Sequence, residues 1–249
     1  MAPNISIREY IRWLPDEASE PTSTFVLTSA ENRFVDIRIL KATNDSQPHT
    51  QTETVLPFTR LDWAFAGTSS SSIRSDPNDS GKQIVHSQWR HWVDSRSAHA
   101  EEIVDEGDMF PQLDGTTLES GAMVNPATGR LTQYEECWRD VEAVATEATG
   151  TADGEGKAMC AVLVLHDDVN GARGVVVRVG QFVQGILRVG GSVSLERWAW
   201  MRDGGWIREV KMGDMWLPCG VVMEGERVRL GGEVKYGDFA WKVVELGEV

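Results

Sequence analysis

The chain has 249 residues, of which 24 are Lys or Arg and 38 are Asp or Glu, so its formal net charge at pH 7 is −14. Hydrophobic residues make up 41% of the sequence and charged residues 25%, an ordinary globular composition that argues against a disordered chain. The acidic excess argues against nucleic acid or an anionic membrane as the main partner, since either would require a basic surface.

Alternating apolar runs rich in Val, Ile, Trp and Phe predict strands along the whole chain. In the first half, the predicted strands are 25–28, 34–40, 61–66, 83–93, 116–123 and 134–144. In the second half, they are 160–166, 174–189, 192–201, 206–212, 216–223, 227–230 and 239–246. Two polar segments, 41–54 and 68–82, are predicted surface loops because they cannot bury enough apolar surface to offset the entropy of ordering.

A domain boundary is predicted at the small, polar, Gly-rich segment 145–158, which lies between two strand-dense regions. The expected domains are residues 1–148 and 149–249. A short repeat supports this division, because GDMFP at 107–111 recurs as GDMWLP at 213–218, and similar strands follow in both halves. The fold class is therefore all-β, with an internal duplication that gives two tandem antiparallel β-barrels of about eight strands each.

The compartment is indicated by the N-terminus and the cysteines. Arg8, Glu9 and Arg12 interrupt the first apolar stretch, so no secretory signal is expected, and no apolar run is long enough to predict membrane insertion. Three widely spaced cysteines predict neither a disulfide scaffold nor a paired zinc or redox motif. The expected location is the cytosol, with diffusion into the nucleus.

The usual catalytic and ligand motifs are not found in the sequence. It contains no phosphate-binding glycine loop and no nucleophile elbow. His86, His91 and His99 are close in sequence, but residues 86 and 91 of a strand point to opposite faces, and no further ligand completes a metal site. We therefore expect no catalytic, cofactor-binding or metal-binding residues, and a protein that is not an enzyme.

Two features leave alternatives open. The densest acidic cluster is either a solvated face or a docking surface for a basic partner, and it comprises Glu101, Glu102, Asp105, Glu106 and Asp108. Ten tryptophans fit either core packing or the lining of an apolar ligand pocket. The candidate pocket residues are Trp63, Phe65, Trp89, Phe182, Trp198 and Trp241.

Two motifs, in the same order as here, resemble a known family. They are the WAFAGT segment, comprising Trp63, Ala64, Phe65, Ala66, Gly67 and Thr68, and a valine-rich strand that ends in Gln184 and Gly185. The sequence is similar in these motifs to the fungal family of casein-kinase-I-interacting proteins, the HRI family first named in yeast. The resemblance implies two lipocalin-like β-barrel domains in a cytoplasmic and nuclear protein of unknown biochemical activity.

The same resemblance implies that a casein kinase I binds the protein or phosphorylates it. This class of kinase favours an acidic or phosphorylated residue three positions before its target. Ser69, Ser72 and Ser75 are spaced by three, and Asp94 precedes Ser97 by three, so these four serines are the candidate phosphosites. The alternative function is a carrier or sensor that holds a small apolar ligand in a barrel.

Overall fold

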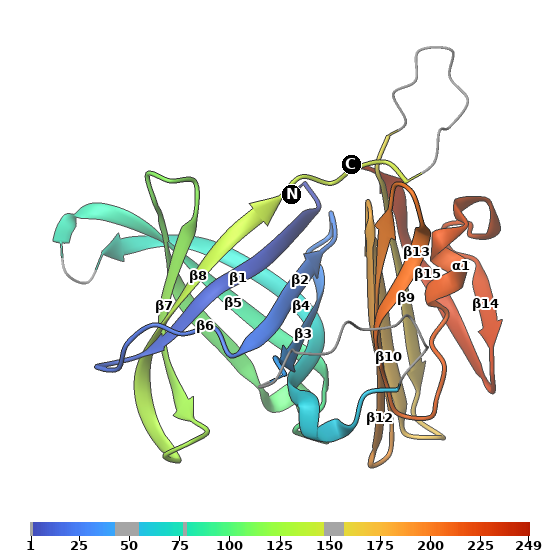
Figure 1. The fold of residues 1–249 in the computed structure, drawn as a ribbon, viewed down its shortest axis with the longest axis horizontal. Coiled ribbons are helices and arrows are strands. Elements are labelled where there is room, and N and C mark those ends of the chain that lie inside the picture. The colour runs from blue at the N-terminus through green and yellow to red at the C-terminus, as the bar shows by residue number, and fades with distance from the viewer. Residues whose placement is uncertain (1, 43–54, 77–78, 147–156) are drawn as a thin grey trace.

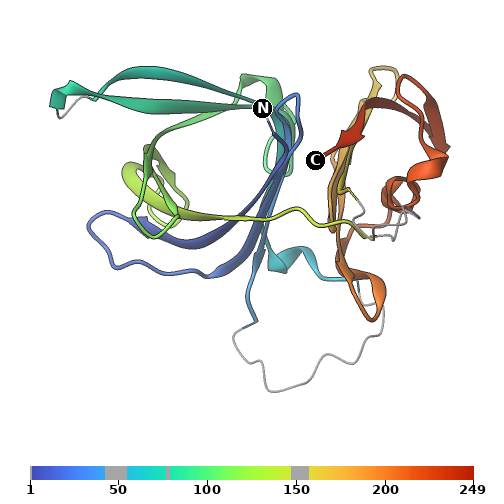
Figure 2. The same ribbon diagram turned by 90° about the horizontal axis from the view of Figure 1, so that it is seen from above.

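A computed structural model describes residues 2–42, 55–76, 79–146 and 157–249, and its two sheets lie side by side (Figures 1 and 2). The chain is all-β, as the alternating apolar pattern predicts. The loop predicted at 41–54 and the predicted boundary at residues 148 and 149 lie almost wholly outside the described residues. Among the described residues, no helix is long and apolar enough to cross a membrane.

The first sheet is a closed barrel of eight antiparallel strands, in which each strand pairs with the next one and β8 pairs with β1. Its strands are β1 (Asn4–Trp13), β2 (Thr22–Thr28), β3 (Arg33–Leu40), β4 (Leu61–Asp76), β5 (Asp79–Asp94), β6 (Val104–Pro111), β7 (Thr117–Asn125) and β8 (Arg130–Val141). Two short 3-10 helices, η1 (Phe58–Arg60) and η2 (Ala100–Glu102), lie in the connections. The expected first barrel is therefore present.

The second sheet has seven strands in the order β13-β12-β11-β10-β9-β15-β14, and its two end strands do not pair with each other. Its strands are β9 (Met159–Asp167), β10 (Ala172–Val179), β11 (Phe182–Val189), β12 (Ser192–Met201), β13 (Gly205–Met212), β14 (Glu233–Tyr236) and β15 (Phe239–Glu248). The connection between β13 and β14 contains helix α1 (Cys219–Met223) and the 3-10 helix η3 (Gly225–Arg227). The expected second closed barrel is thus not formed by the described residues.

The reason for the open sheet is visible in the strand order. Reading the barrel as β5-β4-β3-β2-β1-β8-β7 gives the order of the second sheet, strand for strand, with the counterpart of β6 missing. The segment between β13 and β14 turns away at Gly213, whose φ is +74°, and α1 begins after Pro218, which has no backbone N–H for a sheet. A helical segment therefore takes the place of the sixth strand.

Three sequence predictions are wrong, two in this part of the fold and one at the β4–β5 hairpin. Residues 216–223 and 227–230 do not form strands, because apolar side chains in α1 and beside it pack on one face of the second sheet instead. The predicted loop 68–82 is also wrong for its described residues, 68–76 and 79–82: β4 and β5 continue through the Ser-rich stretch as a long hairpin that projects beyond the barrel (Figure 2). Strand pairing gives the polar backbone its hydrogen bonds there, although little apolar surface is buried.

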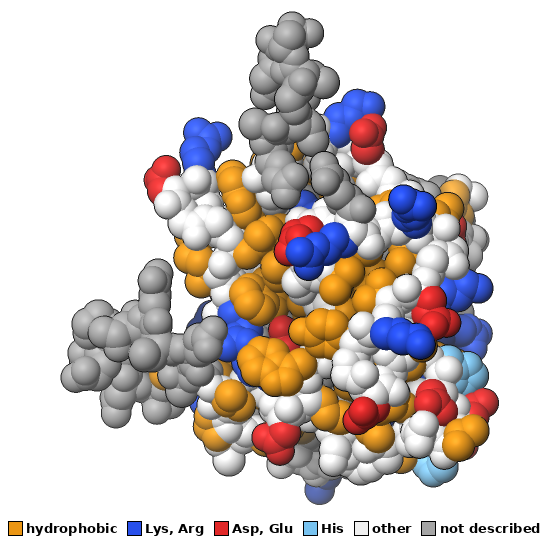
Figure 3. Space-filling model, turned by 90° about the vertical axis from the view of Figure 1, so that its right-hand side faces the viewer, with side chains coloured by type: hydrophobic (Ala, Val, Ile, Leu, Met, Phe, Trp, Pro, Cys, Tyr) orange, Lys and Arg blue, Asp and Glu red, His pale blue; other side chains and the backbone are white. Residues whose placement is uncertain are grey.

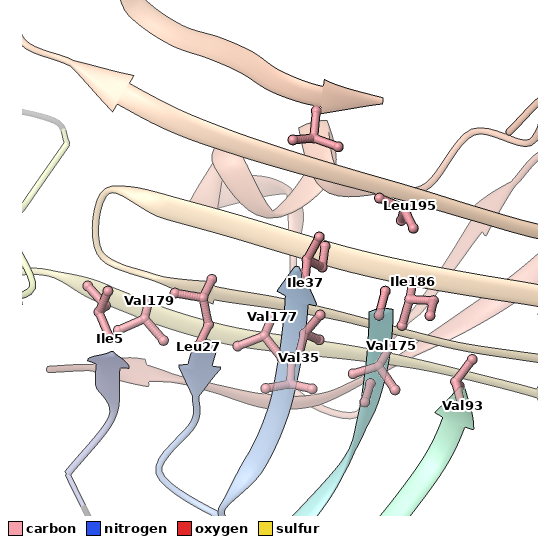
Figure 4. Packing of buried hydrophobic residues seen from close by; sticks show 14 of the residues in the cluster. Ile5, Leu27, Val35, Ile37, Val93, Val175, Val177, Val179, Ile186 and Leu195 are labelled. Atoms are coloured by element: carbon pink, nitrogen blue, oxygen red, sulfur yellow. The ribbon is translucent and has the colours of Figure 1, made fainter. Parts of the chain in front are cut away.

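The barrel packs on the second sheet through an apolar layer, shown in Figure 4. Alternation on β3 sends Val35 and Ile37 outward into this layer, while Phe34, Asp36 and Arg38 face the barrel interior. The second sheet contributes Val175, Val177 and Ile186 from β10 and β11. Since these valine and isoleucine side chains are at most 3% exposed, the two sheets share one core.

Buried polar bonds cross the same layer. The Arg197 guanidinium on β12 donates to the carbonyl oxygen of Ile37 at 2.6 Å and to Ser23 Oγ at 2.9 Å. Gln184 on β11 donates to the carbonyl oxygens of Phe25 and Val35 and accepts from Arg197 Nε at 2.8 Å. These bonds fix the position of the second sheet against β2 and β3, because a slip would leave buried polar groups without partners.

The opposite face of the second sheet carries a separate apolar cluster, which α1 and the segment before it cover. Figure 3 shows this side of the molecule, where hydrophobic side chains gather between charged ones. Trp241 and Leu217 are buried here, while Trp216 is 54% exposed and lies beside the cationic groups of Arg208 and Lys211. The two faces of this sheet are therefore both largely apolar.

Candidate functional site

The barrel encloses a cavity of about 270 Å³ that opens at one end. Its mouth is polar and includes Asn4, Ser6, Asn32, Ser69 and Ser70. Its wall and floor combine aromatic and charged side chains, including Phe34, Asp36, Arg38, Phe65, Trp89, Asp105, Glu119, Tyr134, Glu136 and Trp138. The volume is just below the usual range for ligand pockets of about 300 to 1,000 Å³, so a small ligand fits.

Alternation along the strands carries charged groups to the floor of the cavity. Asp36 and Arg38 on β3 face inward between the outward-facing residues of the apolar layer. On β8 the inward residues are Tyr134, Glu136 and Trp138, all of which are buried. The interior of this barrel is therefore a buried polar network rather than an apolar core.

Two arginines are held by carboxylates at the floor. Arg38 donates to Asp36 Oδ2 at 2.8 and 3.0 Å and to Glu136 Oε1 at 2.9 Å. Arg8 donates to the same oxygen of Glu136, to Glu20 at 2.9 Å and to Thr22 at 2.8 Å. Burial lowers the pKa of both guanidinium groups, but the adjacent carboxylates outweigh this and raise it. Both arginines are therefore charged, and every nitrogen of each guanidinium donates at least one hydrogen bond.

Glu119 on β7 is the most strongly perturbed carboxyl group of the floor. Burial, and next to it the charge of Glu136, raises its pKa from 4.5 to about 8. Its two oxygens accept hydrogen bonds from the Tyr134 hydroxyl at 2.7 Å and from Trp138 Nε1 at 3.0 Å. Glu119 is therefore largely protonated at neutral pH.

A histidine lies at the side of the same interior. His91 Nδ1 is 2.8 Å from Asp94 Oδ2, and its Nε2 is 3.3 Å from Asp105 Oδ2. Burial lowers the pKa of His91, but Asp105 and Asp94 outweigh this and raise it. The His91 ring stacks on the Phe65 ring with centroids 4.2 Å apart, and the Arg38 guanidinium lies 5.4 Å from the centroid of the Phe65 ring. Phe65 is therefore flanked by the Arg38 guanidinium and the His91 ring.

The structure separates the six predicted pocket residues. Phe65 and Trp89 line the cavity, and Trp63 packs behind Phe65, where its Nε1 donates to Asp94. Phe182 packs beside the layer between barrel and sheet. The other two, Trp198 and Trp241, lie on the far face of the second sheet. The charged floor residues were not predicted, although inward charges alternate with apolar residues in the 34–40 strand.

The WAFAGT segment lies in β4, where each position has a distinct packing role. Trp63 and Phe65 face the barrel interior, while Ala64 and Ala66 face outward and are fully buried against the second sheet. Gly67 lies at a register shift with β5, and a Cβ there would be 1.8 Å from the carbonyl oxygen of Arg90. Thr68, by contrast, is exposed. The motif therefore builds the barrel wall and its contact with the second sheet.

Gln184 and Gly185 serve the same contact from the other side. Gln184 is fully buried and bonds to β2 and β3 as described above. A Cβ on Gly185 would lie 2.8 Å from side-chain atoms of both Leu217 and Val176. The family motifs thus explain packing, and they place only Phe65 in the cavity wall.

The four candidate phosphosites are not equally accessible. Ser72 and Ser75 are exposed on the projecting part of the β4–β5 hairpin. Ser69 is half-buried at the mouth of the cavity. Ser97 is half-buried in the turn after β5, where its backbone N–H donates to Asp94 Oδ1 and its hydroxyl accepts from the His99 N–H. Ser72 and Ser75 are therefore the accessible pair.

The acidic cluster at 101–108 does not form one face. Asp105 points into the barrel toward His91, whereas Asp108 pairs with His86 and Arg74. Glu101 instead pairs with Arg173 of the second sheet at 2.8 Å. Neither a uniform solvated face nor a uniform acidic docking surface describes this cluster.

Over the described part of the chain, no group of three or more His, Cys, Asp or Glu side chains could hold a metal ion. The three cysteines, Cys137, Cys160 and Cys219, are buried and free. Burial raises the pKa of the Cys160 thiol to about 11, which keeps this thiol protonated and unreactive at neutral pH.

Fold and interior together define an all-β protein with one closed barrel, a polar barrel cavity and an open second sheet packed against the outside of the barrel. The family model described as Protein HRI1 matches residues 4–245, nearly the whole chain. The chain therefore belongs to the HRI1 family. The resemblance seen in the two sequence motifs is confirmed.

A solved structure has the same fold. It is the crystal structure of the uncharacterized protein YLR301w from Saccharomyces cerevisiae, with a TM-score of 0.70 and 17% sequence identity. The similarity covers 99% of this chain and 100% of that chain. Among curated protein sequences no match is found.

Proposed function

We propose that the protein is a non-enzymatic binding protein whose barrel holds a small molecule. The observation that carries the proposal is the cavity of about 270 Å³, which combines aromatic walls with a charged floor. Eight-stranded barrels that hold one small ligand have this form, and in this sense the proposal keeps the lipocalin-like description. The second sheet, with apolar side chains on both faces, serves as a packing partner rather than a second container.

A substitution that narrows the cavity is expected to remove the ligand. Val26 lines the cavity, and Val26→Phe places a ring in the space. Native mass spectrometry of protein purified gently from its own host should show a small-molecule mass increment for the unmodified protein and a reduced one for Val26→Phe.

The matched control is Val124→Phe, because Val124 is 60% exposed. The control should keep the full increment. If the unmodified protein carries no increment in any preparation, or if Val26→Phe carries as much as the control, the barrel is not the binding site.

A second proposal, which rests on the family resemblance, is that a casein kinase I binds and phosphorylates this protein. The projection of the β4–β5 hairpin favours it, since Ser72 and Ser75 are exposed there. A cytoplasmic and nuclear location belongs to the same proposal, and free cysteines suit a reducing compartment.

With purified kinase, the double variant Ser72→Ala/Ser75→Ala is expected to lose most phosphate incorporation. Its control is Ser69→Ala/Ser97→Ala, since these half-buried serines should be poor substrates. Phosphate incorporation is measured by intact mass. Equal labelling of the unmodified protein and of a variant lacking all four serines would exclude these sites.

A further inference from the structure

The charge balance of the cavity lining is one-sided. Among the described residues, five carboxyl groups line it, and the only arginine or lysine of the lining is Arg38. The carboxyl groups belong to Asp36, Asp105, Glu119, Glu136 and Asp140. Because Glu119 is largely protonated, four of the five carry a negative charge. Arg8 lies just behind the floor and His91 faces Asp105, and even with both counted as cations there are four negative groups to three positive ones. An anionic ligand would therefore meet net repulsion in this interior.

Both arginines are already paired with carboxylates, although Arg38 makes only three bonds with its five N–H donors. The Nε and Nη2 atoms of Arg38 donate hydrogen bonds to Asp36, and its Nη1 donates to Glu136. In Arg8, Nε donates to Glu20, Nη1 donates to Glu136, and Nη2 donates to both Thr22 and Glu20. The charge of each arginine is therefore largely offset by these carboxylates, which reduces its attraction for a further anion.

Acceptor capacity, by contrast, is left over at the floor. The Asp36 side chain is 3% exposed, and its Oδ1 is buried with no hydrogen-bond partner in the part of the chain that the structure describes. Both arginines bind the same oxygen of Glu136, Oε1. A buried carboxylate oxygen without a donor is costly, so this floor is completed by a group that donates hydrogen bonds.

The wall above these oxygens is aromatic. Phe34, Phe65, Trp89 and Trp138 line it, and such ring faces attract cations. Polar lining at the mouth lets a solvated molecule enter. Since the described residues hold no cluster of metal-binding type, the complementary ligand is organic rather than a metal ion.

We propose that the barrel binds a small organic cation, an amine whose ammonium group lies among Asp36, Glu119 and Glu136 and whose apolar body packs against Phe34, Phe65 and Trp89. The proposal rests on the function proposed above and names the chemical class of its ligand. An ammonium next to Glu119 also favours the ionised form of that group, whose pKa of about 8 makes it easy to ionise on binding.

Three probes of equal ring size and different charge test the proposal. They are 1-naphthylmethylammonium, the neutral 1-naphthylmethanol and the anion 1-naphthoate, titrated into the full-length protein by calorimetry near neutral pH. The ammonium probe should bind about tenfold more tightly than the alcohol, and the carboxylate most weakly. Glu136→Gln should reduce this preference severalfold.

The matched control is Glu135→Gln, because Glu135 is on the same strand but pairs with Arg12 outside the cavity. It should keep the preference for the ammonium probe. Should Glu136→Gln fail to fold, the three probes on the unmodified protein still decide the question.

Equal or tighter binding of the alcohol or the carboxylate overturns the assignment to an organic cation but leaves a ligand-binding barrel. Absence of binding by all three probes also overturns the assignment. In either case the mass measurement on Val26→Phe decides the proposed function independently.

Discussion

Replacing Glu119 by glutamine is expected to stabilise the protein at alkaline pH and to leave its stability near pH 4.5 almost unchanged. The folded pKa of Glu119 is raised from 4.5 to about 8 by burial and by Glu136. Between these two values the folded state binds a proton that the unfolded state has lost, so the free energy of unfolding falls as pH rises through this window. Glutamine carries no titrating proton and removes this loss.

The expected difference between variant and unmodified protein grows from near zero at acidic pH to on the order of 5 kcal/mol above pH 8, since the pKa rises from 4.5 to about 8 and one pKa unit corresponds to about 1.4 kcal/mol. Urea unfolding across the pH range measures it. His91, whose pKa is also raised, gives both proteins a further loss of stability with rising pH, and this contribution cancels in the comparison.

Glu106→Gln is the control, because the Glu106 side chain is 58% exposed on β6. Its stability should run parallel to that of the unmodified protein. A Glu119→Gln profile that is also parallel would mean that Glu119 is ionised in the folded protein.

Removing the Arg197 side chain is expected to cost on the order of 3 kcal/mol of folding free energy. Arg197 is buried between barrel and second sheet, and its loss deletes bonds to Ile37, Ser23 and Gln184 and leaves a cavity. Burial lowers its pKa to about 10, so the group is charged at neutral pH and its bonds are charge-assisted. Arg197→Lys should lose less folding free energy than Arg197→Ala but remain less stable than the unmodified protein, because a lysine ammonium cannot reproduce the several bonds of the planar guanidinium.

Thermal unfolding of Arg197→Ala, with Arg202→Ala as the exposed control, measures the effect. Because the bonds cross from one sheet to the other, both sheets should unfold in a single transition in the unmodified protein. An Arg197→Ala variant as stable as the control would show that the apolar layer alone holds the sheets together.

The sequence predicted the all-β class because the alternation in most strands is strong. The predicted segment 34–40 coincides almost fully with β3, and 192–201 coincides with β12. The strand β1 was missed because charged Arg8 and Glu9 interrupt its apolar pattern; Arg8 is nevertheless buried, with its charge matched by Glu136 and Glu20. Propensity alone does not reveal such pairing between distant strands.

The site was predicted less well than the fold, for a physical reason. The search followed apolar rings, whereas the cavity floor consists of charged residues at inward positions such as Asp36 and Glu136. A signal was present, since in RFVDIRIL two charges occupy one face of an otherwise apolar strand. To recognise this signal, inward charged residues must be interpreted as members of a buried polar network.

The second barrel was predicted from the sequence but is not formed by the described part of the chain, for a different reason. The segment 216–223 is apolar enough for a strand, and only its place after Gly213 and Pro218 sends it into a helix that covers the second sheet. The repeated GDM motif still occupies corresponding places, following β5 in the barrel and β13 in the sheet. The duplication therefore remains a prediction that the matching strand order supports.

The second sheet covers only one side of the barrel wall. Strands β1 to β5 pack their outer surface on the shared apolar layer, whereas Val104 on β6 and Val124 on β7 remain exposed. The strands β6 and β7 thus separate the cavity from solvent with no second layer behind them. Local opening costs least where few apolar contacts are broken. Local opening of the barrel is therefore expected first at β6 and β7, where it would widen a cavity that already opens at one end.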